Sequence, residues 1–228
     1  MKIAVCSDVH LEFGPITLEN PGDVDVLILS GDIIVERDLD EWSEVQAENG
    51  FSRHRSVMFH TFFQECAAAF PHVIYVAGNH DWLFQKDPQA AKMLLSEHPD
   101  VIYLQDASIT LEGLRIYGSP WQPWFYDWAF NANSDKLFLL WEKIPGNTDI
   151  LLTHGPPHDI LDLTKRNDKV GCEILKQNIL NRVKPRIHAF GHIHESRGTL
   201  KVGDTTFVNS SCLDERYSFK NEPIVMEI

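Results

Sequence analysis

Short runs of Val, Ile, Leu and Ala recur along the chain, and five of them end at polar residues that bind metals well. Such runs, bounded by turn residues, are typical of buried strands. The residues that follow the five runs are Asp8-Val9-His10, Gly31-Asp32, Gly78-Asn79-His80-Asp81, His154-Gly155 and Gly191-His192-Ile193-His194. The repetition predicts a sheet-containing fold that carries its chemistry on loops at strand ends.

The remaining segments alternate between expected strands and helices. Strands are expected at residues 2–7, 24–30, 73–77, 101–117, 150–152 and 186–190, with a hairpin turn at Glu112-Gly113 and further strands around Gly203-Asp204. Helical periodicity is found over residues 54–70, 88–97, 134–143 and 171–183. The acidic segment 36–50 is expected to form a loop on the active side. Because no linker divides these pieces, we predict a single domain over residues 1–228.

Charge and composition exclude several classes of protein. The formal net charge is −13, from 20 basic and 33 acidic residues, which disfavours tight non-specific binding of nucleic acids. The longest apolar runs are far shorter than the roughly 20 residues of a membrane helix, and no signal-type apolar core develops at the N-terminus. Cys6, Cys66, Cys172 and Cys212 are scattered. A soluble protein in a reducing cytoplasm is the simplest interpretation.

The five motifs together favour a metal site. Asp8 and His10 are two residues apart, so both side chains can lean toward one point in an extended segment. The two carboxylate oxygens of Asp32 can bridge two cations when the neighbouring glycine leaves space. Each motif alone is also compatible with an ordinary polar turn. Five such motifs at five strand ends are better explained by a common metal site.

The order of these motifs resembles that of calcineurin-like metallophosphoesterases along the whole chain. Residues 117–125, 153–157, 170–172 and 190–195 are similar to the group of metallophosphoesterase-domain-containing proteins, which is linked to cyclic-nucleotide phosphodiesterase activity of the class III type. The resemblance implies an α/β (α+β) fold, namely a four-layer αββα sandwich in which helices flank two mixed β-sheets.

The resemblance also implies two divalent metal ions. It assigns Asp8, His10, Asp32 and His194 to one metal, and Asp32, Asn79, His154 and His192 to the other, with Asp32 as the bridge. Mixed oxygen and nitrogen ligands favour Mn²⁺, Fe or Zn²⁺ over Ca²⁺, and the lack of a cysteine ligand argues against a thiolate zinc site. We expect Mn²⁺.

The implied activity is hydrolysis of a small phosphodiester, a cyclic nucleotide in particular, by a metal-bridging hydroxide. His80 is expected to act as the general acid, with Asp81 orienting its ring; the alternative is that His80 only packs beneath its loop. One alternative function is a phosphomonoesterase or protein phosphatase with the same metals. Another is a nucleotide-binding regulatory module with weak catalysis, which the presence of all seven ligands disfavours.

Contacts to the substrate are less well defined by the sequence. Arg197, His158 and Asn209 are candidate substrate-binding residues, each with a surface or turn-capping role as the alternative. The related group usually has Gly-Tyr after the His-Glu pair, whereas Ser196-Arg197 stands here. For the aromatic segment 121–130 and for Trp82, packing over the sheet edge is favoured over stacking on a nucleobase.

Overall fold

The structure is a computed structural model that describes residues 1–34 and 50–228, and its first sheet has five strands. The strand order is β13-β1-β2-β3-β4, and β1 through β4 are parallel while β13 pairs antiparallel with β1. The strands are β1 (Lys2–Cys6), β2 (Val26–Ser30), β3 (His72–Val76), β4 (Val101–Tyr103) and β13 (Ile224–Glu227).

The second sheet has six strands in the order β11-β12-β10-β9-β6-β5. Its four central strands are parallel, and its two edge strands are antiparallel to their neighbours. The strands are β5 (Ala107–Leu111), β6 (Leu114–Ser119), β9 (Ile150–Thr153), β10 (Ile187–Phe190), β11 (Gly198–Val202) and β12 (Thr205–Asn209). The predicted hairpin turn at Glu112-Gly113 is confirmed, since it joins β5 to β6 with both residues at positive φ.

Alternate residues of each central strand enter different cores. Ile3 and Val5 of β1 pack between the two sheets against residues such as Ile150 and Leu152 of β9. Ala4 of β1 points to the opposite face and joins the core beneath the helices of the first sheet. Because a strand in such a sheet is buried on both faces, it reads as a continuous apolar run. The apolar runs of the sequence are therefore interior strands.

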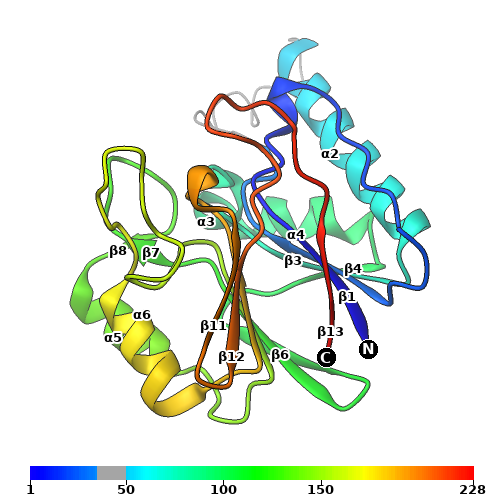
Figure 1. The fold of residues 1–228 in the computed structure, drawn as a ribbon. Helices are drawn as coiled ribbons and strands as arrows, with labels where there is room; N and C mark the ends of the chain where they lie inside the picture. Colours follow the sequence, from blue (N-terminus) through cyan, green and yellow to red (C-terminus); the bar gives the residue numbers. More distant parts are fainter. Residues whose placement is uncertain (35–49) are drawn as a thin grey trace.

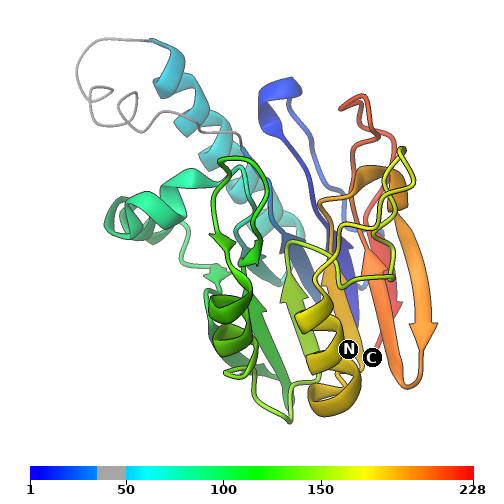
Figure 2. The ribbon, with the colours of Figure 1, turned by 90° about the vertical axis from the view of Figure 1, so that its left-hand side faces the viewer.

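Helices cover the outer face of each sheet, so the layers are helix, sheet, sheet, helix (Figure 1). The first sheet is covered by α2 (Gly50–Ala69), α3 (Trp82–Lys86) and α4 (Pro88–Ser96), and the second by α5 (Ser134–Trp141), α6 (Glu173–Asn178) and the π-helical turn Ile179–Val183. Figure 2 shows α5 and α6 in front of the second sheet. The predicted four-layer fold is confirmed. The predicted loop 36–50 lies outside the described residues, except for Gly50.

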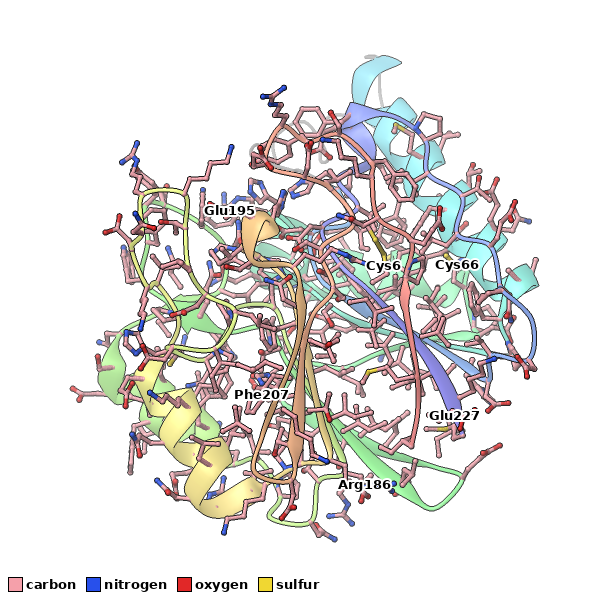
Figure 3. All side chains as sticks on the ribbon, viewed as in Figure 1. Cys6, Cys66, Arg186, Glu195, Phe207 and Glu227 are labelled. Atoms are coloured by element: carbon pink, nitrogen blue, oxygen red, sulfur yellow. A yellow bond between two sulfur atoms is a disulfide. The ribbon has the colours of Figure 1, made fainter. Side chains whose placement is uncertain are left out.

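The motif-bearing loops gather at one end of the sandwich. Glu195, which follows the last histidine motif, lies at the upper end in Figure 3, whereas Arg186, just before β10, lies at the lower end. The two termini are also at the lower end, where the N–H of Ile228 donates to the carbonyl of Met1 at 3.0 Å (Figure 1). Among the described helices, none is both long and apolar enough to cross a membrane.

A disulfide joins Cys6, the last residue of β1, to Cys212, which follows β12. The two cysteines are 206 residues apart in the sequence, and they meet because Ser7 and Ser211 form a parallel bridge between the two sheets. Cysteine spacing gave no indication of this pair. Cytoplasmic location, which we inferred partly from that spacing, stays a prediction.

Candidate metal centre

Five loops bring the predicted ligands together in two adjacent clusters. The loops after β1 and β10 provide Asp8, His10 and His194, and the ligand atoms of these three lie within 4.8 Å of one another. The second cluster meets the same limit and contains Asp32, His154 and His192. The Oδ1 atom of Asn79 lies 2.8 Å from Nε2 of His154, which places the amide beside the second cluster.

The carboxylate of Asp8 is buried and held from several sides. Its Oδ2 atom accepts hydrogen bonds from the hydroxyls of Ser7 and Ser211, each at 2.6 Å, and from the backbone N–H of His192 at 3.0 Å. The Oδ1 atom is 3.4 Å from Nε2 of His194. These bonds fix the carboxylate before any cation arrives, as is usual for groups that orient metal ligands.

Three of the four cluster histidines are also oriented through the ring nitrogen that faces away from the centre. The Nδ1 atom of His154 lies 2.8 Å from the carbonyl of Ser30, and that of His194 lies 3.0 Å from the carbonyl of Asp214. A carbonyl only accepts, so both Nδ1 atoms donate and both Nε2 atoms face the centre. His10 follows the same pattern with the carboxylate of Glu12 at 3.1 Å.

The inner ring nitrogens fit a cation. Nε2 of His10 is buried without a hydrogen-bond partner, 3.6 Å from Oδ2 of Asp32. Nε2 of His154 faces both the same carboxylate oxygen, at 3.3 Å, and the amide oxygen of Asn79. Buried polar atoms normally have partners. A divalent ion would satisfy these nitrogen and oxygen atoms together.

The charges of the centre depend on paired histidines and carboxylates. Burial alone would lower the pKa of His154, but the nearby Asp32 carboxylate outweighs it and raises that pKa to about 9. Asp8 has the same effect on His194, whose pKa also rises to about 9. Burial and the neighbouring His154 lower the pKa of His192 to about 3. The protons on His154 and His194 therefore occupy positions that a metal ion takes when it binds.

Four of the predicted ligands have a left-handed backbone. The φ angles are 54° at Asp8, 45° at His10, 55° at Asp32 and 69° at His192. Non-glycine residues rarely adopt this conformation, and clusters of such residues are typical of functional sites. The loops are thus shaped for the direction of these side chains rather than for the lowest backbone energy.

Two motif glycines are required by close packing of the loops. A Cβ atom at Gly78 would lie 2.2 Å from Oδ1 of Asp32. A Cβ atom at Gly191 would lie 1.9 Å from Oγ of Ser7 and 2.1 Å from Oδ2 of Asp8. The glycines therefore let neighbouring loops approach the ligand carboxylates directly.

We expect Gly191→Ala to lower the free energy of unfolding by about 1–3 kcal/mol, because the added methyl group displaces the Asp8 carboxylate. The melting temperature should fall by roughly 2–4 °C per kcal/mol in a chain of this length. Thermal unfolding and metal analysis after Mn²⁺ loading check this. Gly146→Ala is the matched control, since its Cβ would meet nothing within 4 Å. A Gly191→Ala protein with the wild-type melting temperature and metal content would contradict the packing argument.

The predicted role of Asp81 in orienting His80 is wrong. The Asp81 carboxylate points beneath the loops and accepts four backbone N–H groups, at 2.6–3.3 Å, with no bond to His80 among the described residues. The donors are Asp32, Ile33, Ile34 and Gly78. Asp81 therefore ties the loop after β2 to the loop after β3.

His80 itself lies beside the centre. Its backbone N–H donates to Oδ1 of Asp32 at 2.8 Å, and its Nε2 atom lies 4.0 Å from Oδ2 of the same residue. The ring is 5.0 Å from the ring of His10 and 5.5 Å from that of Trp128. Burial lowers the pKa of His80. The imidazole is thus placed next to the ligands without belonging to either cluster.

Arg197 and Asn209, which the sequence predicted as substrate contacts, bind backbone carbonyls instead of facing the two clusters, so their substrate contacts stay predictions that their positions do not favour. The guanidinium of Arg197 donates to the carbonyls of Ser211, at 2.8 Å, and Glu222, at 2.6 Å, so it holds the C-terminal segment. Asn209 is fully buried and donates to the carbonyl of Ile193 at 2.8 Å. Both side chains support loops of the site from behind.

His158 lies with surface acids rather than facing the two clusters. Its Nδ1 atom is 3.2 Å from carboxylate oxygens of both Asp159 and Glu173. Lys169 and Lys176 also pair with Asp159. The three acidic and imidazole groups could in principle meet around an ion, but the two ammonium groups already neutralise this surface. A substrate contact for His158 stays a prediction that its position does not favour.

Several residues of the site were missed from the sequence. Ser7 and Ser211 hold Asp8, and Tyr217 packs its half-exposed ring 5.2 Å from the rings of both His10 and His194. Ser7 precedes a ligand and Ser211 follows a strand, which is a weak signal. Tyr217 has none, because only the fold brings its loop to the centre.

The comparison with known families agrees with this geometry. A family model described as calcineurin-like phosphoesterase matches residues 1–196, a range that contains all seven predicted ligands. The chain belongs to this family. Its members are metal-dependent phosphoester hydrolases, so the family implies divalent metal ions, and the two ligand clusters fit them.

Individual relatives support the same assignment. The chain is 37% identical to human metallophosphoesterase domain-containing protein 1 over 98% of this chain and 70% of that protein. It is 31% identical to a UPF0046 protein of Caenorhabditis elegans over the whole of this chain and 81% of that protein. The crystal structure of the protein TT1561 of Thermus thermophilus has a TM-score of 0.56 at 16% identity, with 91% of this chain and 88% of that chain covered, which shows a shared fold.

Proposed function

We propose that this phosphoesterase is a dinuclear-metal phosphodiesterase that hydrolyses small phosphodiesters, with cyclic nucleotides as the favoured class. The observation that carries the proposal is the position of Asp32. Its Oδ2 atom lies 3.3 Å from Nε2 of His154 in its own cluster and 3.6 Å from Nε2 of His10 in the other cluster. One carboxylate oxygen between two ligand sets is the arrangement that a bridging ligand needs.

In this proposal Asp8, His10, Asp32 and His194 hold one ion, and Asp32, Asn79, His154 and His192 hold the other. When bound, two such ions supply Lewis-acid stabilisation of the phosphate charge and lower the pKa of the attacking water. They also bring four positive charges to two carboxylates, which attracts a small phosphate despite the net charge of −13. Large polyanions are still repelled by the acidic surface.

His80 acts as the general acid in this proposal. Its ring lies beside both the ligands and Trp128, so its imidazolium can protonate the oxygen of the departing alcohol. Because burial lowers its pKa, the acid form is populated toward acidic pH, and a step that uses it slows as the pH rises. Asp32 keeps the His80 loop in place through the backbone bond described above.

Mn²⁺ is our proposed native metal, and the cytoplasm our proposed location. The mixed histidine, carboxylate and amide ligands support Mn²⁺, with Fe or Zn²⁺ as the alternatives. Metal analysis of protein purified without added metal tests the first point.

We expect bis-p-nitrophenyl phosphate to be hydrolysed with at least a tenfold higher kcat/KM than p-nitrophenyl phosphate in the presence of Mn²⁺. The physical reason is that the second aromatic substituent of the diester can pack against the Trp128 ring, which lies 5.6 Å from the ring of the predicted ligand His192, whereas the monoester has no second substituent. Protein stripped of metal with a chelator is the control and should be inactive on both. A preference for the monoester would favour the phosphomonoesterase alternative.

A further inference from the structure

A pocket of about 310 Å³ adjoins the second ligand cluster. Trp124, Phe125 and Trp128 form one wall, Pro156 and Val170 contribute to the lining, and His192 connects the pocket to the centre. The Trp128 ring lies 5.6 Å from the His192 ring in an edge-to-face arrangement. The volume is at the lower end of the range for small-ligand pockets, roughly 300–1,000 Å³. It suits one ring system rather than a large molecule.

The aromatic wall is exposed but well ordered by hydrogen bonds. Trp124 is 69% exposed and Phe125 is 49% exposed, so these two rings do not serve the packing role favoured from the sequence. The loop that carries them is held by Asn131, whose side-chain N–H groups donate to the carbonyls of Phe125 and Tyr126, both at 3.1 Å. Exposed aromatic faces on a fixed loop are suited to stacking with a flat ring.

One polar atom in the lining lacks a partner. Gln122 is buried and lines the pocket, and its Nε2 atom donates to the carbonyl of Ala129 and to the side chain of Asn131. The Oε1 atom has no hydrogen-bond partner. It faces Gly155, another lining residue, where a Cβ would lie 4.0 Å away. A buried acceptor without a partner favours a ligand that brings an N–H donor.

We propose that this pocket binds a flat heteroaromatic ring with an N–H donor, carried by the substrate as one ester substituent of its phosphate. The proposal rests on the proposed function, because the metal centre sets the position of the phosphate. A phosphate at the His154 and His192 cluster projects one substituent past Trp128 into the pocket. There the ring stacks on Trp124 or Phe125, and its N–H group points to Gln122.

The test measures binding to the Mn²⁺-loaded protein by titration calorimetry. Adenosine 5′-monophosphate carries such a ring, ribose 5-phosphate lacks it, and purine riboside 5′-monophosphate lacks only the exocyclic amine. We expect adenosine 5′-monophosphate to bind at least about tenfold more tightly than ribose 5-phosphate, the effect of one stacked base. Loss of the amine should weaken binding by about two- to tenfold.

Trp124→Ala should reduce the preference for adenosine 5′-monophosphate over ribose 5-phosphate to about threefold or less. The affinity for ribose 5-phosphate itself should stay unchanged. Phe138→Ala is the matched control, since this side chain is 55% exposed on α5 and does not line the pocket. It should keep the wild-type ratio. A loss of the ratio in both variants would contradict the assignment to this pocket.

Two further outcomes separate this proposal from the proposed function. Equal binding of adenosine 5′-monophosphate and ribose 5-phosphate to the wild-type protein overturns the pocket proposal but leaves the phosphate site intact. The expected ratios without any hydrolysis of diesters support the pocket and overturn the phosphodiesterase. Equal binding of the two purine compounds overturns the role of Gln122.

Discussion

Asp32→Asn is expected to reduce kcat/KM for bis-p-nitrophenyl phosphate by roughly 10³-fold or more. The amide loses the negative charge that both ligand sets share, and charge stabilisation by metals contributes several kcal/mol to such reactions, with each 1.4 kcal/mol equal to a factor of about ten. Metal content should fall from two ions per chain to one or none. Steady-state kinetics and elemental analysis of the same preparation measure both effects.

Asp23→Asn provides the control for Asp32→Asn. The Asp23 side chain is 81% exposed and pairs with Lys2 at the far end of β1, and its backbone has a φ of 55° like that of Asp32. This change should leave activity and metal content as they are. If Asp32→Asn retained two ions and more than about a tenth of the activity, Asp32 would not be the bridge.

His80→Ala is expected to lower kcat by roughly 10²–10⁴-fold for diesters with an alkoxide leaving group, while both ions stay bound. The loop should remain in place, because the bond to Asp32 comes from the backbone of residue 80. For bis-p-nitrophenyl phosphate the loss should be much smaller, since the acidic p-nitrophenol leaves without protonation. Comparing the two classes of substrate separates a general acid from a structural residue.

His72→Ala is the control for His80→Ala, since His72 begins β3 at the end opposite to the metal centre. It should change neither substrate. An equal loss on both classes in His80→Ala, or a loss of both ions, would show that His80 supports the site rather than protonating the leaving group.

Local patterns in the sequence predicted the interior strands and the grouping of the candidate ligands at one end of the sandwich, whereas the four-layer arrangement followed from the family resemblance. Interior strands such as β2 are buried on both faces, so they appear as continuous apolar runs. Each ligand follows such a run by a few residues, and parallel strands carry their ends to one edge. The position of Asn79 beside His154, 75 residues later, follows from that rule.

The sequence did not predict the directions in which the loop side chains of Asp81 and Arg197 point. Asp81 follows His80 directly, but a turn sends its carboxylate beneath the loops to four backbone N–H groups. Arg197 lies three residues after a ligand and still points to the carbonyls of Ser211 and Glu222. Proximity in the sequence does not fix orientation in a loop, since each residue there has its own φ and ψ.

The exposed aromatic wall shows a related limit. Trp121 and Phe130 of the same segment contribute to packing as expected, since Phe130 is buried and Trp121 packs against the cores of both sheets. Trp124 and Phe125 instead line a pocket. Composition alone cannot tell which aromatic residues of this segment pack in a core and which line the pocket. That depends on how Asn131 holds the loop.

The bond from Ser211 to Asp8 spans 203 residues, and the carbonyl of Asp214 orients His194. Both groups lie beyond residue 196, where the match to the family ends. Neither Ser211 nor Asp214 belongs to one of the five ligand motifs, so the motifs alone would not indicate that a substitution at either position affects the site. In a survey of natural variants, the C-terminal segment therefore belongs with the catalytic loops when changes in this chain are ranked by their effect.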